Sequence, residues 1–343
     1  MFDIFNNDAF SVTSLTDAMR EVQYVPGFVS SLGLFQTESV DTLSVVIEKD
    51  SDDVYSIVPA SPRGGPGDTT GKGRRTMRDL RIPHFQRDDS IMADEVQGIR
   101  AFGTERQVEL LQSKIARRAR EHSTSFALTE EYHRLSVITQ GKLLDKDGSV
   151  IYNYFSEMGE SQPAEVDWEL DAASPEDGVL RQKSADLMRA IGTTLGGLPF
   201  SGVLALCGDE FYDGLLRHKN YLDTYKGYEG VRELRNGFLA ANNPQGGAWG
   251  VVEAFNITWA NYRGGFNVGI AAAEAKFVPL GVPGLFRTVY APADYEETVN
   301  TPGQRLYAKQ WPMPNGKGRA MEFQTNSLHY CTRPRVLMRG RRT

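Results

Sequence analysis

Four side chains capable of acid, base or metal-binding chemistry fall on one predicted helix. They are Asp209, Glu210, Asp213 and His218, and they follow a short apolar strand that ends at Cys207. Carboxylates and an imidazole at this spacing could serve general acid–base catalysis or hold a metal ion. The same residues also suit a helix without a site, because acids stabilise its N-terminal end and a histidine its C-terminal end. The second interpretation is favoured, and a soluble enzyme built on this cluster is kept as an alternative.

The other catalytic templates fail at specific positions. The glycine-rich stretch before Lys72 is no phosphate-binding loop, because Pro66 stands where a glycine is needed and Gly73 where Ser or Thr is needed. Ser201 lacks the glycine two residues earlier that a nucleophile elbow requires. The five histidines show no H-x-H or H-x-x-x-H spacing. We therefore predict no catalytic residue, no metal and no cofactor.

Composition places the chain among ordinary globular proteins. It has 343 residues, a net charge of −6, 40% hydrophobic and 24% charged residues, enough to bury a core and form about two domains. No run of about 18 apolar residues suggests a membrane span, and the N-terminus has no pattern of a secretory signal. The cysteines, Cys207 and Cys331, lie far apart, so a reducing compartment without a disulfide framework is expected.

Charge is segregated along the chain. Residues 1–60 hold ten acids and two basic residues, a net charge of −8, whereas residues 61–87 hold seven basic residues and two acids, a net charge of +5. The tail 333–343 adds five arginines and no acid. Such segments suit contacts between copies of the chain or with nucleic-acid phosphates. Pairing with acids of neighbouring subunits is favoured, while phosphate attraction by the tail and solvated faces of a monomer remain alternatives.

The spacing of apolar residues predicts a mixed α+β fold. An arm at 1–35 carries a short helix after Ser14, and strands at 42–49 and 54–60 form a hairpin. Residues 61–75 contain five glycines and two prolines, which predicts a long basic loop. A long helix follows at 104–138. The other predicted elements are a hairpin at 141–158, a helix from Pro175 to the stop at Gly196, a strand at 203–207, a helix at 209–218, and strands at 250–262, 266–272, 277–280, 320–330 and 335–338.

Short motifs in a fixed order along nearly the whole chain carry a family resemblance. They are FQTESV at 35–40 before the strand 42–48, PRGG at 62–65, GVLAL at 202–206 before LLR at 215–217, and PGLFRTVYAPAD at 283–294. Their order and spacing resemble the major capsid proteins of tailed bacteriophages, specifically the lambda E-like branch of the Hong Kong 97-type capsid fold.

The resemblance implies a division of the chain. Residues 1–35 would form the N-terminal arm and 36–90 the E-loop. Residues 91–179 would form the peripheral domain, with its spine helix and hairpin, 180–290 the axial domain, and 291–343 a return to the peripheral domain. Because arm and loop reach over neighbours in such shells, residues of opposite charge on them are expected at the interface between subunits. These residues are Arg63, Lys72, Arg74, Arg75, Arg78, Arg81, Asp41, Glu48, Asp52 and Asp53.

The implied function is structural. Copies of the chain would assemble as hexamers and pentamers into an icosahedral head in the cytoplasm of the bacterial host and enclose double-stranded DNA without sequence-specific binding, so the protein resides in the virion and touches no membrane. A separate scaffold protein, a portal and a decoration protein are the expected partners.

Some relatives cross-link a loop lysine to an asparagine. Lys72 is the one loop lysine, no partner asparagine can be placed, and no cross-link is expected. An encapsulin-type nanocompartment, which shares the fold, is the related alternative.

Overall fold

The computed structural model of the protein describes residues 27–50, 75–97, 104–226, 248–262 and 269–343. The predicted helix after Ser14 and the predicted strand at 54–60 lie outside these residues.

The described elements confirm a mixed α+β fold. They are α2 (Phe28–Ser31), β1 (Phe35–Ser39), β2 (Ser44–Asp50), β3 (Arg75–Arg81), β4 (His84–Met92), α3 (Ala93–Gln97), α4 (Thr104–Gln140), β5 (Lys142–Leu144), β6 (Val150–Asn153), α5 (Tyr154–Glu157), β7 (Glu165–Asp167), α6 (Val179–Leu195), β8 (Gly202–Cys207), α7 (Asp209–Arg217), α8 (Lys219–Lys226), β9 (Ala248–Ala254), β10 (Ile257–Tyr262), β11 (Glu274–Leu280), β12 (Phe286–Tyr290), η5 (Glu296–Thr298), β13 (Tyr307–Pro312), β14 (Gly318–Cys331), η6 (Pro334–Val336) and β15 (Met338–Arg341).

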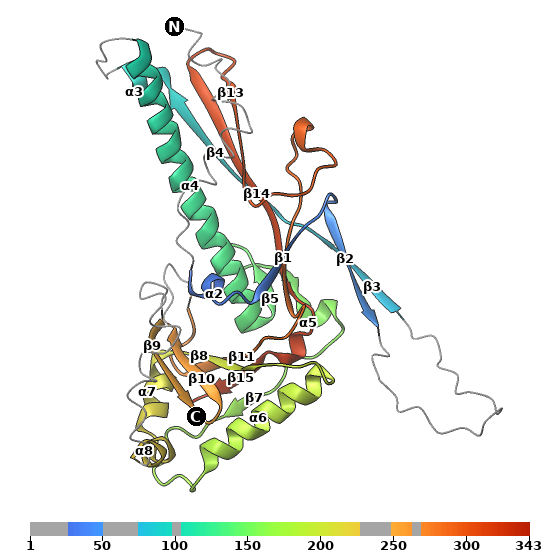
Figure 1. Ribbon diagram of the computed structural model, residues 1–343, viewed down its shortest axis with the longest axis vertical. Coiled ribbons are helices and arrows are strands. Elements are labelled where there is room, and N and C mark those ends of the chain that lie inside the picture. The colour runs from blue at the N-terminus through green and yellow to red at the C-terminus, as the bar shows by residue number, and fades with distance from the viewer. Residues whose placement is uncertain (1–26, 51–74, 98–103, 227–247, 263–268) are drawn as a thin grey trace, which may run out of the picture.

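The long helix α4 confirms the predicted spine. It runs for 37 residues, about 55 Å at 1.5 Å per residue, and β4, β13 and β14 lie along it (Figure 1). Its buried positions Ile115, Ala119 and Phe126 pack with Met321 and Phe323 of β14. One apolar stripe therefore holds the helix against the sheet between Ile115 and Phe126. Among the described residues, no helix is long and apolar enough to cross a membrane.

Strand β14 organises a five-stranded sheet. Its first half pairs antiparallel with both β13 and β4, and its second half pairs antiparallel with β12. Strand β1 completes the sheet by pairing parallel to β12, with Phe35 opposite Phe286 and their ring centroids 5.2 Å apart. The segment before the hairpin is thus tied to the C-terminal third of the chain.

A six-stranded sheet forms the other end of the molecule, in the order β7-β15-β11-β8-β10-β9. Helices α6, α7 and α8 lie at this end (Figure 1). Its centre is a cluster of large rings, because Trp168, Trp259, Phe211 and Phe277 are fully buried with centroids 5.1 to 6.2 Å apart. Strand β15 closes the sheet beside β11 and β7. Strands β13 and β14 lie along α4 (Figure 1), whereas β15 pairs in the six-stranded sheet.

Strands β2 and β3 form a separate two-stranded hairpin that projects away from both sheets (Figure 1). They pair antiparallel from Ser44 opposite Arg81 to Asp50 opposite Arg75. The described partner of β2 is therefore β3, at 75–81, whereas the predicted partner was 54–60. By register, Asp50 of the acidic segment lies opposite Arg75 of the basic segment, so the two segregated segments come together within one chain.

Several predicted boundaries are wrong for local reasons. The helix α6 begins at Val179 and not at Pro175, because Gly178 adopts a left-handed φ of 79° immediately before it. The strand predicted at 250–262 is two strands, divided by a turn at Phe255 and Asn256 with φ values of 55° and 63°. The end of the predicted hairpin at 141–158 is the short helix α5.

Two of the predicted strands near the C-terminal end also need correction. Residues 269–272 of the strand predicted at 266–272 contain no strand. The last predicted strand, at 335–338, lies three residues early, because Pro334 starts the short helix η6 and β15 begins at Met338.

We predict that Gly340→Ala destabilises the protein by at least about 2 kcal/mol through overpacking. A Cβ atom at this position would lie 2.5 Å from Trp168 Nε1 and 2.9 Å from Phe277 Cε2, so β15 or the ring cluster would have to move. Urea unfolding of the unassembled subunit measures the loss. Gly202→Ala is the matched control, since a Cβ there meets nothing within 4 Å; equal stability of both variants would contradict the prediction.

Candidate functional site

The predicted acid and histidine cluster is spread along α7 and not gathered into a site. Asp209 and Glu210 begin the helix and His218 caps its end, so about 13 Å of axial rise separates them. Glu210 forms an ion pair with Arg342 at 3.7 Å, and His218 Nδ1 accepts a hydrogen bond from the Asn220 backbone N–H at 3.2 Å. Burial, with a smaller contribution from Lys183, lowers the pKa of His218. Within the described ranges, no group of three or more His, Cys, Asp or Glu residues could hold a metal ion.

The predicted interface residues divide into three groups. Arg63, Lys72, Arg74, Asp52 and Asp53 lie outside the described residues, and only the backbone of Arg75 and Glu48 is described. Arg78 and Arg81 are exposed on β3, and Asp41 is exposed just before β2.

The β2–β3 hairpin exposes apolar side chains as well as charges. Leu43, Val46 and Met77 are 61%, 54% and 62% exposed, the largest fractions among apolar side chains in this part of the structure. Exposed apolar surface on a projecting element is typical of a contact with another protein. The exposed apolar side chains therefore make this hairpin a candidate interface, and the charge pattern of the sequence did not indicate them.

A joint of buried carboxylates on α4 ties α2, at the start of the described chain, and the segments around Tyr290 and Arg305 to this helix. Glu131 Oε1 accepts the backbone N–H of Val29 at 2.6 Å, and Oε2 accepts the N–H and the hydroxyl of Ser30 at 3.0 and 2.7 Å. The carboxylate thus satisfies backbone donors at the start of α2 that have no partner within the helix. Gly27 precedes them because a Cβ there would lie 2.2 Å from Glu131 Cδ.

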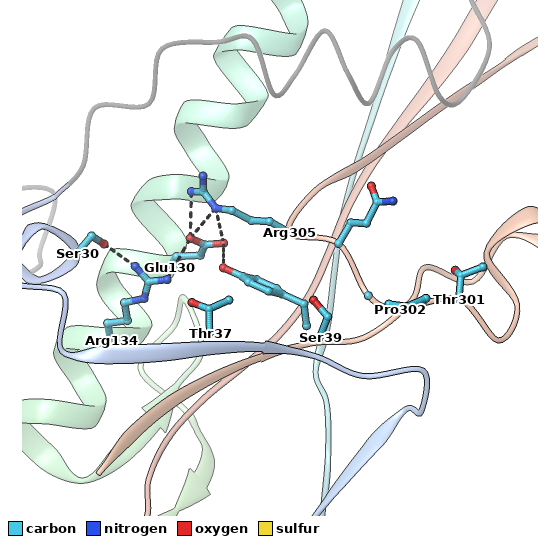
Figure 2. A pocket seen from close by; sticks show the side chains of 11 residues that line it. Ser30, Thr37, Ser39, Glu130, Arg134, Thr301, Pro302 and Arg305 are labelled. Atoms are coloured by element: carbon cyan, nitrogen blue, oxygen red, sulfur yellow. Dashed lines mark hydrogen bonds and ion pairs between the residues drawn. The ribbon is translucent and has the colours of Figure 1, made fainter. Parts of the chain in front are cut away.

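Glu130, the neighbour of Glu131 on α4, points towards Arg305 and Tyr290 of β12 (Figure 2). It is 1% exposed and forms ion pairs with Arg305 at 3.0 Å and Arg134 at 3.7 Å. Tyr290 of β12 donates its hydroxyl to Glu130 at 3.1 Å. Burial and the neighbouring carboxylate raise the pKa of Tyr290, so this phenol remains a donor at neutral pH. Two cations and a hydroxyl offset the cost of burying one carboxylate.

Arg134 extends the joint towards β1. It donates to Ser30 Oγ at 2.7 Å, and its guanidinium carbon lies 5.7 Å from the centroid of the Phe35 ring. The same residues line an open cavity of about 770 Å³ between α4, β1 and the segment 301–305 (Figure 2). Sequence reasoning missed this joint; the available signal was a pair of adjacent acids on a predicted helix, with an arginine four residues after Glu130.

A pair of buried histidines lies beside the joint. His133 of α4 and His329 of β14 are 1% and 0% exposed, with ring centroids 5.9 Å apart. Burial lowers the pKa of His133 to about 4, against a smaller opposing effect of Asp145. Burial, with repulsion from Arg134, His133 and Arg305, also lowers the pKa of His329. Both rings are therefore neutral at physiological pH.

Comparison with known protein sequences gives one consistent family. The sequence model of the family described as Phage major capsid protein E matches residues 11–342. The chain is 27% identical over 345 residues to the major capsid protein of Pseudomonas phage KPP10, with 97% of each chain covered. It is 25% identical over 360 residues to the major capsid protein of Salmonella phage Felix O1, covering 94% of this chain and 95% of the relative.

Solved structures share the fold. A proposed prophage capsid protein from E. coli CFT073 superposes with a TM-score of 0.57 at 12% identity, covering 97% of this chain and 99% of that one. The capsid of an empty GTA particle superposes with a TM-score of 0.51 at 10% identity, covering 94% of this chain and 92% of that one. These similarities confirm the predicted capsid fold.

We predict that Glu130→Gln lowers the free energy of unfolding by about 3 kcal/mol, because removing one member of a buried ion pair leaves the other charges uncompensated. Chemical denaturation of the unassembled subunit tests this. The control is Asp186→Asn, which removes the carboxylate of an exposed pair with Arg189 and should cost less than about 1 kcal/mol. A cost for Glu130→Gln no larger than the control's would mean that the joint does not stabilise the fold.

Acid should destabilise the subunit through the buried histidines. An unfolded histidine has a pKa near 6.5, so the unfolded chain binds more protons than the folded one as pH falls from about 6.5 towards 4. The stability that neutral His133 contributes is full above that window and is lost within it, a change of up to about 3 kcal/mol. Unfolding measured at several pH values should show a weaker pH dependence for His133→Gln than for the parent; identical slopes would refute the assignment.

Proposed function

The chain belongs to the phage major capsid protein E family, and from this membership we propose that the β2–β3 hairpin and the N-terminal segment join neighbouring copies in the shell. The family membership itself makes the protein a major capsid protein of a tailed phage: a structural component of the virion that builds the icosahedral head, and not an enzyme. The resemblance noted in the sequence is thereby confirmed at the level of the family, and both the enzyme and the nanocompartment alternatives are set aside. Placement in the lambda E-like branch stays a prediction.

The observation that carries the proposal is the exposed hairpin. A two-stranded hairpin is marginally stable by itself in water, yet this one projects from the body (Figure 1) and leaves Val46 and Met77 more than half exposed. A neighbouring copy that covers it would bury this apolar surface. Arg78 and Arg81, exposed on the same hairpin, supply charge for the contact, together with the predicted interface residues outside the described ranges.

The division of the chain into functional parts is also proposed. The spine helix α4 with β4, β13 and β14 corresponds to the peripheral part, and the six-stranded sheet with α6 and α7 to the axial part that meets its copies around the symmetry axes. Strand pairing departs from the predicted boundaries of these parts in two places. Strands β7 and β15 pair within the six-stranded sheet, whereas β12, at the end of the proposed axial segment 180–290, pairs in the sheet of β14.

Further partners follow from the family's role. We expect hexamers and pentamers of this chain, a separate scaffold protein, a portal and a decoration protein, with assembly in the cytoplasm of the host. The enclosed double-stranded DNA would be held without sequence-specific contacts.

Reversing the charge of Arg74, Arg75 and Arg78 to Glu is expected to block shell assembly while the subunit stays folded, because these side chains would then repel the acidic surface of a neighbour. Electron microscopy of the variant, co-expressed with the other head proteins, counts closed particles, and circular dichroism reports the fold. A triple reversal at Arg117, Arg120 and Arg189, all exposed outside the hairpin, controls for net charge. Normal shells from the hairpin variant would contradict the proposed interface.

A further inference from the structure

One face of the five-stranded sheet is turned away from the helix α4. Asp89 of β4 points to α4, where Arg118 binds it at 3.0 Å. Successive side chains of a strand alternate between the two faces of a sheet, so Asp88 points to the opposite face. By register, Asp88 lies beside Glu322 of β14, and Glu322 lies beside Lys309 of β13. Three charged side chains therefore form one row on the face that the helix does not cover.

The loop at 291–304, which follows β12, brings a further carboxylate to this row. Tyr295 of the loop donates a hydrogen bond from its hydroxyl to Glu322 Oε1 at 3.1 Å, and Asp294 directly precedes it. Burial raises the pKa of Tyr295, and the carboxylates of Glu322, Asp294 and Asp88 raise it further. The negative potential of all three carboxylates therefore reaches the buried phenol.

The carboxylates on this face outnumber the cations that pair with them. Lys309 donates to both carboxylate oxygens of Glu297 in the loop, at 2.9 and 2.8 Å. Within the described part of the chain, Asp88, Asp294 and Glu322 form no ion pair with a basic side chain. Carboxylates that lie close together repel one another, and a cation bound between them relieves the repulsion.

A buried carboxamide connects two of these carboxylates. Gln324 of β14 is 0% exposed, and its Nε2 donates to Asp294 Oδ1 at 2.5 Å and to Glu322 Oε1. The two carboxylate oxygens are therefore less than about 5 Å apart, a gap that one Ca²⁺ ion spans because it holds oxygen ligands at about 2.3 to 2.6 Å. The loop and the strand thus present two carboxylates at the separation that a single cation requires.

The oxygen of the same carboxamide is a second sign of a ligand. Gln324 Oε1 is buried and accepts no hydrogen bond from the residues that the structure describes. Nearly all buried polar atoms of native proteins have a partner, because an unpaired one is destabilising. Rotation about the last side-chain torsion exchanges Oε1 with Nε2, which turns Oε1 towards both carboxylates. Carboxylate and amide oxygens are ligands that Ca²⁺ prefers in proteins.

Solvent reaches these oxygens from the side of the loop. Asp294 is exposed and lines a hollow of about 470 Å³ beside the sheet. Water entering there would complete the shell of a cation, since Ca²⁺ takes about six to eight oxygen ligands. The site has two close acids and an amide, so it differs from the groups of three or more acidic, histidine or cysteine ligands that the described residues lack.

We propose that Asp294, Glu322 and Gln324 bind a Ca²⁺ ion, which ties the loop at 291–304 to the central strand β14. The two carboxylates supply the charge, and Gln324 Oε1 supplies a neutral oxygen. Ca²⁺ is preferred to Mg²⁺ because Mg²⁺ demands near-octahedral geometry, whereas Ca²⁺ accepts an irregular one. The sequence predicted no metal, because residue 294 and residues 322–324 are distant in it. The site does not depend on the interface proposed for the hairpin.

Calorimetric titration of the full-length, unassembled subunit with Ca²⁺ tests the proposal. The parent should bind one ion per chain. Asp294→Asn should raise the Kd at least about tenfold, because even the loss of a group that only supports a metal ligand costs about 10- to 100-fold in affinity. Asp294 is exposed, so this variant should fold. Glu296→Gln is the matched control, since it removes an exposed acid of the same loop and should change the Kd less than about fivefold.

Thermal unfolding of the parent gives a second readout that needs no variant. Ca²⁺ should raise the Tm, because a ligand that binds only the folded chain stabilises it. NaCl at the same ionic strength should raise the Tm less, because it only screens the charges. Absence of binding by the parent, equal weakening in Asp294→Asn and Glu296→Gln, or an equal rise in Tm with NaCl would overturn the proposal. Each of these results would leave the capsid function standing.

Discussion

Burying two adjacent carboxylates on one helix constrains the arrangement of the whole chain. Glu130 and Glu131 of α4 are 1% and 5% exposed, and an unpaired charge at such positions would cost several kcal/mol. Apart from Arg134 on the same helix, their partners come from segments more than 100 residues away in sequence, from α2 on one side and from Tyr290 and Arg305 on the other. The spine helix is therefore the element to which the start of the described chain and the five-stranded sheet are both fixed.

This joint explains how a thin hairpin can project without the body losing its shape. Strand β1, held by Arg134 and by its pairing with β12, fixes the chain just before β2. Strand β4, paired with β14 over nine residues, fixes it just after β3. Both ends of the hairpin thus leave from a rigid sheet, and its exposed apolar face is presented in a defined direction.

The sequence predicted those elements whose signals are local. Helix α4, strand β8, helix α7 and the hairpin of β5 and β6 follow from apolar spacing, caps and turn residues within a short window. Strands β1, β4, β12 and β13 were not predicted, because partners distant in sequence, such as β14 for β4, decide whether such segments become strands. The joint at Glu130 and Glu131 was not predicted for the same reason, because most of the residues that pair with these acids are distant in sequence. The family motifs supplied the fold, but not this chain's own contacts.

Charge segregation was the strongest functional signal in the sequence, and the structure changes its meaning. By strand register one pair of unlike charges, Asp50 of β2 and Arg75 of β3, lies directly opposite within the hairpin, and a cross-strand pair of opposite charge contributes a fraction of a kcal/mol. Charges that neutralise each other locally provide little energy for holding subunits together, although they can orient an approaching hairpin. The exposed apolar residues Val46 and Met77 have no such internal partner, so burial of their surface is the larger contribution available to a contact between copies. Many weak, identical contacts of this kind can form reversibly before a shell closes.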